Sequence, residues 1–240
     1  MLSNFDRSLS AVFFDAVRPL FGGLLKQSQV DGLKAIVAAW NKYGDGDTGK
    51  LAYVLATAFL ETAQTMQPVR ETLASSDAKA KEILTKAWKS GKLKVSKDYW
   101  SSGYFGRGYV QLTHKENYEK AGRKLGVDLV GNPSLALDPD ISARVLIVGM
   151  LEGWFTGKRL DSYIGDGVDF INARRVVNGT DKAPHIAMLA NSFLRALEAV
   201  PATPPAPSPP PEAAPQASGL PGALLALISF ILGLFKRKSP

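Results

Sequence analysis

A proline-rich stretch limits the part of this chain that can fold around a core. Residues 201–216 contain eight prolines in sixteen positions. Such a run favours an extended polyproline II spacer and cannot supply the buried apolar surface of a domain. We therefore expect one folded domain over residues 1–200, which is long enough to enclose a sizeable core, and a linker over residues 201–217.

The segment after this linker is strongly apolar. Residues 220–235 carry no charged side chain and are followed by Lys236, Arg237 and Lys238. A helix of this length spans about 24 Å, which approaches the ~30 Å hydrocarbon core of a bilayer. We expect residues 218–240 to form a C-terminal hydrophobic helix that crosses a membrane. A helix docked on a membrane surface or on another protein is the alternative.

Residue types that are absent or rare narrow the possible chemistry. The chain has no cysteine and only two histidines, His114 and His185. This excludes a disulfide framework, a cysteine-ligated metal and a cysteine nucleophile, and it argues against a histidine metal site. Residues 45–47 resemble a fragment of a calcium loop, but Ala56 stands where that loop needs a glutamate. We expect no metal and no cofactor.

The net charge of the whole chain is +7. Residues 1–200 hold 26 basic and 21 acidic side chains. A basic body suits a polyanionic partner such as nucleic acid, acidic lipid or bacterial cell wall, although a simply solvated surface explains it equally well. We treat the basic residues as dispersed rather than clustered, and therefore expect no nucleic-acid partner.

Apolar residues recur at helical spacing through most of the domain, which predicts a mainly α fold. The expected helices cover residues 9–17, 29–43, 50–67, 77–89, 114–126, 140–156, 168–177 and 182–199. Pro68 should end the third of these helices. Residues 99–112 are rich in glycine and aromatic side chains, and they predict a small β-hairpin or a loop.

Two glutamates are the first candidates for catalysis. Glu61 lies in a helix that is otherwise almost wholly apolar, so burial should raise its pKa and keep a proton available, as a general acid requires. The alternative is a glutamate that faces solvent or pairs with an arginine such as Arg70. Glu71 lies beyond the break at Pro68, where the chain can turn and bring it across a cleft from Glu61. Two carboxylates facing each other across a groove are the machinery of glycoside hydrolysis.

A second group of candidates lies in residues 104–118. Gly106 and Gly108 flank Arg107, which allows a tight backbone and a close approach of a ligand. Amide and aromatic side chains suited to sugar hydroxyls, acetamides and rings follow in the same segment: Tyr109, Gln111, Asn117 and Tyr118. A hairpin with core aromatic residues explains the same pattern.

A third segment covers residues 172–183. Asn178 and Gly179 are typical of a turn or a helix C-cap. Arg174 and Arg175 either pair with carboxylates or face solvent.

In these three segments the chain resembles glycoside hydrolase family 19, the chitinases and especially the phage and prophage endolysins of that family. The family's catalytic helix carries His-Glu-Thr or His-Glu-Ser, and this chain has Leu60, Glu61 and Thr62. The resemblance covers roughly residues 10–198. Two further motifs match the family, namely Phe105-Gly106-Arg107-Gly108 with Gln111-Leu112-Thr113 and Asn117-Tyr118, and Val177-Asn178-Gly179.

The resemblance implies an α-rich, lysozyme-like fold with a small β element in the cleft wall. It implies Glu61 as the proton donor and Glu71 as the base of an inverting reaction. Arg107 would brace the site, and side chains lining the sugar groove would include Gln111, Asn117 and Asn178. Leu60 replaces the usual histidine, so one contact to the catalytic helix is missing.

The expected function is cleavage of β-1,4 bonds between N-acetylated sugars of peptidoglycan by a monomeric, endolysin-like or muramidase-like enzyme. The basic body and the apolar segment favour peptidoglycan over chitin. Such an enzyme, encoded by a host or by a phage, would act on the periplasmic cell wall from the bacterial inner membrane or a virion. A chitinase, a lytic transglycosylase with a single acid, and an inactive membrane-tethered glycan-binding module are the alternatives.

Overall fold

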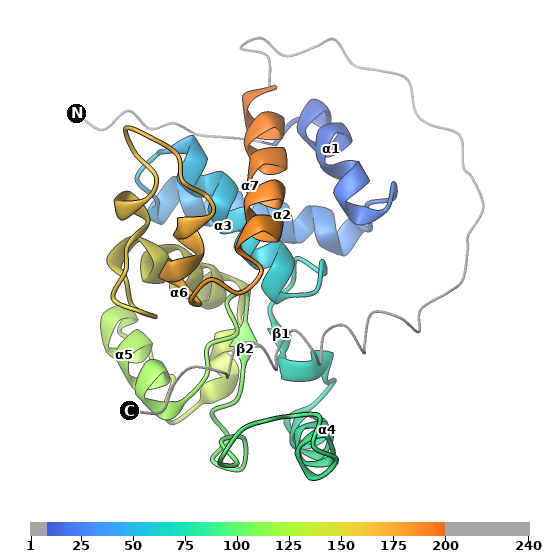
Figure 1. The fold of residues 1–240 in the computed structure, drawn as a ribbon, viewed down its shortest axis with the longest axis vertical. Coiled ribbons are helices and arrows are strands. Elements are labelled where there is room, and N and C mark those ends of the chain that lie inside the picture. The colour runs from blue at the N-terminus through green and yellow to red at the C-terminus, as the bar shows by residue number, and fades with distance from the viewer. Residues whose placement is uncertain (1–8, 200–240) are drawn as a thin grey trace.

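The computed structural model describes residues 9–199 of the chain, shown as coloured ribbon in Figure 1. The expected linker at residues 201–217 and the expected hydrophobic helix at residues 218–240 lie outside the described residues. Within residues 9–199, no helix combines the length and the apolar character that a membrane crossing needs.

The described part is mainly helical, which confirms the expected fold class. Its α-helices are α1 (Ala11–Val17), α2 (Gln27–Tyr43), α3 (Thr48–Glu61), α4 (Asp77–Lys89), α5 (Lys115–Leu125), α6 (Pro139–Glu152) and α7 (Ala183–Glu198). Short 3-10 helices cover Arg18–Phe21, Glu71–Leu73, Pro133–Leu137, Leu160–Ser162 and Asn172–Val176. Strands β1 (Val69–Arg70) and β2 (Arg107–Gly108) pair antiparallel, with Val69 opposite Gly108.

The centre of the fold is α3, which is apolar on nearly every face and buried along most of its length. Asp47 caps its start, accepting a hydrogen bond of 2.8 Å from the backbone N–H of Lys50. Helices α2, α6 and α7 all pack against α3. The helix therefore delivers its last residue, Glu61, from within the main core.

The end of α3 differs from the sequence prediction, which continued this helix to residue 67. The helix stops at Glu61 because Ala63, Gln64 and Met66 take up positive φ angles of 48°, 68° and 53°. The Thr62 hydroxyl stabilises the turn by donating to the Ala58 carbonyl at 2.7 Å and accepting from the Met66 N–H at 3.1 Å. The chain thus reverses before Pro68 and enters β1.

Two other predicted elements also differ. Residues 168–177 were expected to form an α-helix, and instead a 3-10 helix covers only Asn172–Val176. The glycine-rich segment 99–112 contains β2, but its strand partner is β1, about forty residues earlier in the sequence. A single bridge between Arg107 and Leu112 closes the expected tight loop within the segment.

A second, smaller core lies beside the main one. It contains Ala74, Ala80, Leu84, Ala87, Leu93, Trp100 and Phe105. We call residues 74–105, which include α4 and the loop after it, the lysine lobe, because they carry seven lysines. In Figure 1 α4 lies at the end of the molecule opposite α1 and α7.

Candidate active site

Glu61 is fully enclosed at the C-terminal end of α3. Its Oε1 accepts a hydrogen bond of 2.9 Å from Nη1 of Arg174, and both side chains are shielded from solvent. Arg174 lies in the 3-10 helix Asn172–Val176, and its Nε donates to the Asp181 carbonyl at 3.0 Å. The arginine partner that the sequence suggested for Glu61, Arg70, pairs with Asp77 instead.

Burial dominates the electrostatics of Glu61. It raises the pKa of this carboxyl group, while the charge and hydrogen bond of Arg174 act in the opposite direction. Several buried polar atoms around the pair have no hydrogen-bond partner among the described residues: Tyr53 Oη, Glu61 Oε2, Arg174 Nη2 and Asn178 Nδ2. Since buried polar atoms are normally hydrogen-bonded, this cluster has donors and acceptors to offer a polar ligand.

Glu71 is held in a separate set of contacts where β1 ends. Its Oε1 accepts a hydrogen bond of 2.5 Å from the Tyr99 hydroxyl, and its Oε2 accepts one of 2.8 Å from the Gly106 N–H. Burial raises the pKa of Glu71 to about 7, although Tyr99, Gly106 and the charge of Arg107 all lower it. A carboxyl group with this pKa can exchange a proton near neutral pH, as general acid–base catalysis requires.

Gly106 is required by the packing around Glu71. A Cβ atom at this position would lie 2.7 Å from Gln111 Oε1 and 3.3 Å from Glu71 Oε2. Any larger residue would therefore force the Gln111 side-chain amide to shift and would crowd the Glu71 carboxyl group.

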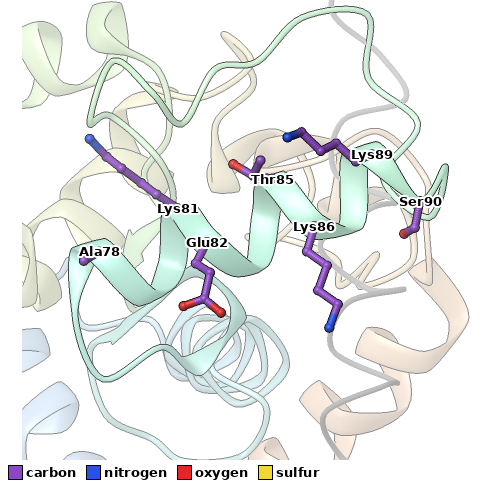
Figure 2. Close-up of a pocket in the computed structure, with 7 residues that line it drawn as sticks. All are labelled: Ala78, Lys81, Glu82, Thr85, Lys86, Lys89 and Ser90. Carbon is purple, nitrogen blue, oxygen red and sulfur yellow. The ribbon is translucent and has the colours of Figure 1, made fainter.

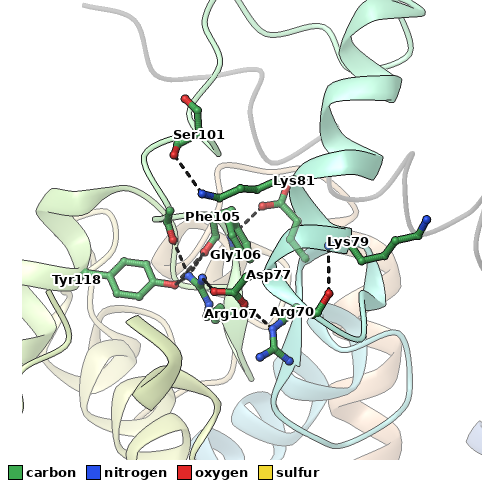
Figure 3. Close-up of polar contacts among 12 residues, drawn as sticks. Arg70, Asp77, Lys79, Lys81, Ser101, Phe105, Gly106, Arg107 and Tyr118 are labelled. Atoms are coloured by element: carbon green, nitrogen blue, oxygen red, sulfur yellow. Dashed lines mark hydrogen bonds and ion pairs between the residues drawn. The ribbon is translucent and has the colours of Figure 1, made fainter. Parts of the chain in front are cut away.

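Arg107 supports the segment that contacts Glu71 (Figure 3). Its side chain is buried, and its Nη2 pairs with Asp77 Oδ2 at 2.7 Å, while Arg70 Nε reaches the other oxygen of Asp77 at 2.6 Å. Nη1 of Arg107 donates to the Gly103 carbonyl at 2.8 Å and to the Tyr118 hydroxyl at 3.0 Å. Arg107 thus positions the backbone that binds Glu71, and it has no surface to offer a ligand.

Asp77 has its charge fixed by the same network. Burial raises the pKa of Asp77, but the hydrogen bonds and charges of Arg70 and Arg107 outweigh it and hold the pKa below its usual range. The Asp77 carboxylate therefore stays ionised, and paired with Arg70 and Arg107, as the pH falls.

The two tyrosines expected to face sugar rings are part of the core in this structure. Tyr109 is packed in the main core. Tyr118 is also fully buried, and its hydroxyl donates to the Phe105 carbonyl at 2.8 Å. The aromatic pattern of this segment thus reflects packing, which was the alternative interpretation.

Of the three expected amide residues, Gln111 lies near Glu71, Asn178 lies beside the Glu61 pair, and Asn117 contacts neither glutamate. Gln111 lies near Glu71, where its Nε2 donates to the carbonyls of Val69 and Gly108, and its Oε1 has no partner among residues 9–199. Asn117 Nδ2 donates to the Thr113 carbonyl at 2.7 Å. The backbone N–H of Asn178 donates to the Arg174 carbonyl at 2.9 Å, which places it beside the Glu61 pair.

Two contact residues of the glutamates could not be assigned from the sequence. Pairing with a carboxylate was one alternative for both Arg174 and Arg175, and the structure confirms it for Arg174 with Glu61, although nothing in the sequence separates the two arginines. Tyr99 is 28 positions from Glu71, and its role depends on the fold of the lysine lobe. Across residues 9–199 there is also no group of histidine, aspartate and glutamate side chains that could hold a metal ion.

Comparison with solved structures finds proteins with a similar fold. Chitinase C from Streptomyces griseus HUT6037 superposes with a TM-score of 0.53 at 18% identity, covering 79% of this chain and 76% of that one. A mutant of chitinase C gives a TM-score of 0.50 at 18% identity, over 80% of this chain and 93% of that one. At this identity the similarity establishes a shared fold, the α-rich fold of a chitinase.

Sequence comparison shows a similarity to one family over part of the chain. Residues 90–158 match the glycoside hydrolase family 19 model, described as chitinase class I. Acidic endochitinase pcht28 of Solanum chilense is 58% identical over 50 residues, which are 20% of this chain and 20% of that protein. Chitinase 11 of Oryza sativa subsp. japonica is 56% identical over 45 residues, 18% of each chain. The matched segments thus span about one-fifth of these curated relatives.

Together these comparisons confirm the resemblance to glycoside hydrolase family 19. The family match includes the string from Phe105 to Tyr118, with Arg107 and Gln111. It includes neither Glu61 nor Glu71. The roles of the two glutamates therefore depend on their geometry and environment.

Proposed function

We propose that this protein is a glycoside hydrolase that cleaves β-1,4 bonds between N-acetylated sugars of peptidoglycan, with Glu61 as general acid and Glu71 as general base. The observation that carries the proposal is the environment of Glu61. A carboxyl group with a raised pKa ends a core helix, is fixed by Arg174, and keeps one oxygen without a partner among the described residues.

In the proposed reaction, the Glu61 carboxyl group donates its proton to the glycosidic oxygen as the bond from that oxygen to the anomeric carbon breaks. The Glu71 carboxylate accepts a proton from a water molecule, whose oxygen bonds to the anomeric carbon from the opposite face. The products are two sugar chains, one with a new reducing end. Arg174 would stabilise the carboxylate that remains on Glu61, because a charge-assisted hydrogen bond is already in place.

Access to both glutamates requires movement. Glu61 is 2% exposed and Glu71 is 1% exposed, so neither can touch a sugar in this arrangement. The Tyr99 side chain covers Glu71 from the lysine lobe, and Arg174 covers Glu61 from a 3-10 helix. Tyr99 belongs to the lysine lobe, so Glu71 can be uncovered by movement of that lobe. The 3-10 helix of Arg174 contributes Ala173 and Val176 to the main core, so uncovering Glu61 requires movement of the Arg174 side chain rather than of the whole helix.

Peptidoglycan is proposed over chitin because of features outside the cleft. The chain has a net charge of +7 and no cysteine, and residues 220–235 carry no charged side chain. These features suit an enzyme that acts on an anionic bacterial wall from a membrane. Chitin is the second candidate, since the similar proteins named above are chitinases or endochitinases.

The test is digestion of purified peptidoglycan and of chitin oligomers by the full chain, with products identified by mass spectrometry. We expect new reducing ends from peptidoglycan, and no products from the Glu61→Gln and Glu71→Gln variants. Anhydro-sugar ends, or full activity in Glu71→Gln, would indicate a lytic transglycosylase. Digestion of chitin alone would indicate a chitinase, and binding without any product would indicate an inactive glycan-binding module.

We also propose that residues 218–240 hold the enzyme at a bacterial membrane beside the wall. Expression of the chain with and without this segment, followed by fractionation, tests the idea. The full chain should pellet with membranes and the shortened chain should not. Equal recovery of both forms in the supernatant would contradict the proposal.

A further inference from the structure

Positive charge is concentrated on the lysine lobe, contrary to the expectation that basic residues are dispersed. The lobe carries seven lysines: Lys79, Lys81, Lys86, Lys89, Lys92, Lys94 and Lys97. The same stretch, residues 77–98, contains only Asp77, Glu82 and Asp98 as acidic residues, which leaves it with a net charge of +4.

Most of this charge has no counterion within the described residues. Asp77 is engaged by Arg70 and Arg107, and Glu82 pairs with Lys79 at 2.8 Å. No ion pair within residues 9–199 involves five of the lysines, which are all exposed: Lys86, Lys89, Lys92, Lys94 and Lys97. The lobe therefore presents uncompensated positive charge to solvent.

The shape of this surface suits an extended ligand. A shallow groove of about 720 Å³ runs along α4 (Figure 2). In that view Lys81 and Lys89 point to one side of the helix and Lys86 points to the other. The eleven residues from Lys79 to Lys89 span ten helical rises, or about 15 Å of helix. Charges spread over such a length, with none of the seven lysines buried, match a chain of anionic groups better than one small anion.

The lobe is fastened next to Glu71 at both ends of its charged segment. At its start, Asp77 pairs with Arg107, and near its end the Tyr99 hydroxyl donates to Glu71. A polymer bound to the lobe would therefore lie close to the proposed base. A polymer that is itself attached to the wall glycan would then hold the sugar strand near Glu71.

We propose that the lysine lobe binds a linear, phosphate-bearing polymer attached to the cell-wall glycan, and so retains the substrate strand beside Glu71. Lysine ammonium groups suit this role because they are compact point charges that bind successive phosphates without fixed geometry. Nucleic acid is a weaker fit, because single strands are bound by stacking on several aromatic side chains, and Trp88 is the one large exposed aromatic residue of the described chain. The choice of a wall polymer rests on the proposed function, and it applies to walls whose glycan carries such a polymer rather than to the periplasmic wall expected from the sequence.

The experiment measures binding of the full chain to bacterial walls that carry phosphate polymers, and to the same walls stripped with hydrofluoric acid. All proteins carry Glu61→Gln, so that cleavage does not remove the ligand. The lobe variant replaces Lys86, Lys89 and Lys92 by glutamine. The matched control replaces three exposed lysines elsewhere, namely Lys34, Lys115 and Lys158.

We expect the lobe variant to bind intact walls at least about tenfold more weakly at ~0.1 M salt, and the control variant to bind within about threefold of the parent. The slope of log affinity against log salt should fall by about 2 in the lobe variant, since each phosphate contact contributes ~0.7. Stripped walls should bind the parent as weakly as intact walls bind the lobe variant.

Three results would overturn the proposal. Equal losses in the lobe and control variants would show an effect of net charge alone, and unchanged binding to stripped walls would exclude the phosphate polymer. Tighter binding to a DNA fragment at equal phosphate concentration would indicate nucleic acid instead. A second variant in the loop, Lys94→Gln with Lys97→Gln, repeats the test without altering α4. Because binding is measured without cleavage, failure of the proposed hydrolysis would be seen separately, in digestion of stripped walls by the unmodified chain.

Discussion

Removal of one hydroxyl group next to Glu71 tests whether this residue is the base. Tyr99→Phe deletes the hydrogen bond of 2.5 Å to Glu71 Oε1 and keeps the ring, which packs edge-on against Trp100 at 5.0 Å and His114 at 5.5 Å. The pKa of Glu71 is about 7 with this hydrogen bond present. Since the bond favours the charged carboxylate, its loss must raise the pKa further.

The size of the effect follows from the strength of the bond. A hydrogen bond to a charged group contributes about 1.5–3 kcal/mol, and about 1.4 kcal/mol corresponds to a tenfold change in proton affinity. The acidic limb of the profile of kcat/KM against pH should therefore move upward by about one to two pH units. At pH 6 the variant should be roughly 10- to 100-fold slower than the parent, with the gap closing as the pH rises.

The assay is release of reducing ends from peptidoglycan between pH 5 and pH 9. Tyr104→Phe is the matched control, because it also removes a tyrosine hydroxyl, one that donates to the Val130 carbonyl at 3.2 Å. Its acidic limb should not move. A Tyr99→Phe profile with an unshifted limb, or with the same loss at every pH, would refute the assignment of Glu71 as the base.

The remaining predictions concern stability and packing. Folding raises the pKa of Glu71 from 4.5 to about 7, so ionisation of this residue destabilises the fold as the pH rises through 7. In urea unfolding at pH 8, the free energy of unfolding of Glu71→Gln should therefore be higher than that of the parent by up to about 3 kcal/mol. This difference should vanish below pH 4.5. Arg174→Met should lower the free energy of unfolding by about 3–5 kcal/mol by leaving Glu61 unpaired, and adding Glu61→Gln should recover part of that loss. Gly106→Ala should cost about 1–3 kcal/mol through its clash with Gln111, with a lowered melting temperature as the readout.

The helices were predictable where their ends carry chemical signals. Helix α4 begins and ends at the predicted residues, and the Ser76 hydroxyl caps it by accepting a hydrogen bond of 3.2 Å from the Lys79 N–H. The predicted end of helix α3 lies six residues too late because the helix stop uses Ala63, Gln64 and Met66 at positive φ. These residue types rarely adopt that conformation, so the turn is dictated by tertiary contacts and leaves no local signal.

The candidate site was predictable only in part. Burial of Glu61 follows from the apolar pattern of its helix, which can be seen in the sequence. Its partner Arg174 is 113 positions away and differs from Arg175 only in the direction its side chain takes in the fold. The contact between Tyr99 and Glu71 likewise depends on the pairing of β1 with β2, which no periodicity encodes.

The small core of the lysine lobe shares no residue with the main core. Substitutions on the lobe surface therefore change what the protein adheres to without loosening the helix that presents Glu61. An exchange of residues 78–98 between related proteins that keeps Asp77 and Tyr99 would retain the attachment points beside Glu71. The polymer that the lobe binds and the bond that the site cleaves can therefore change independently. The first would change through residues 78–98, and the second through the main core around α3.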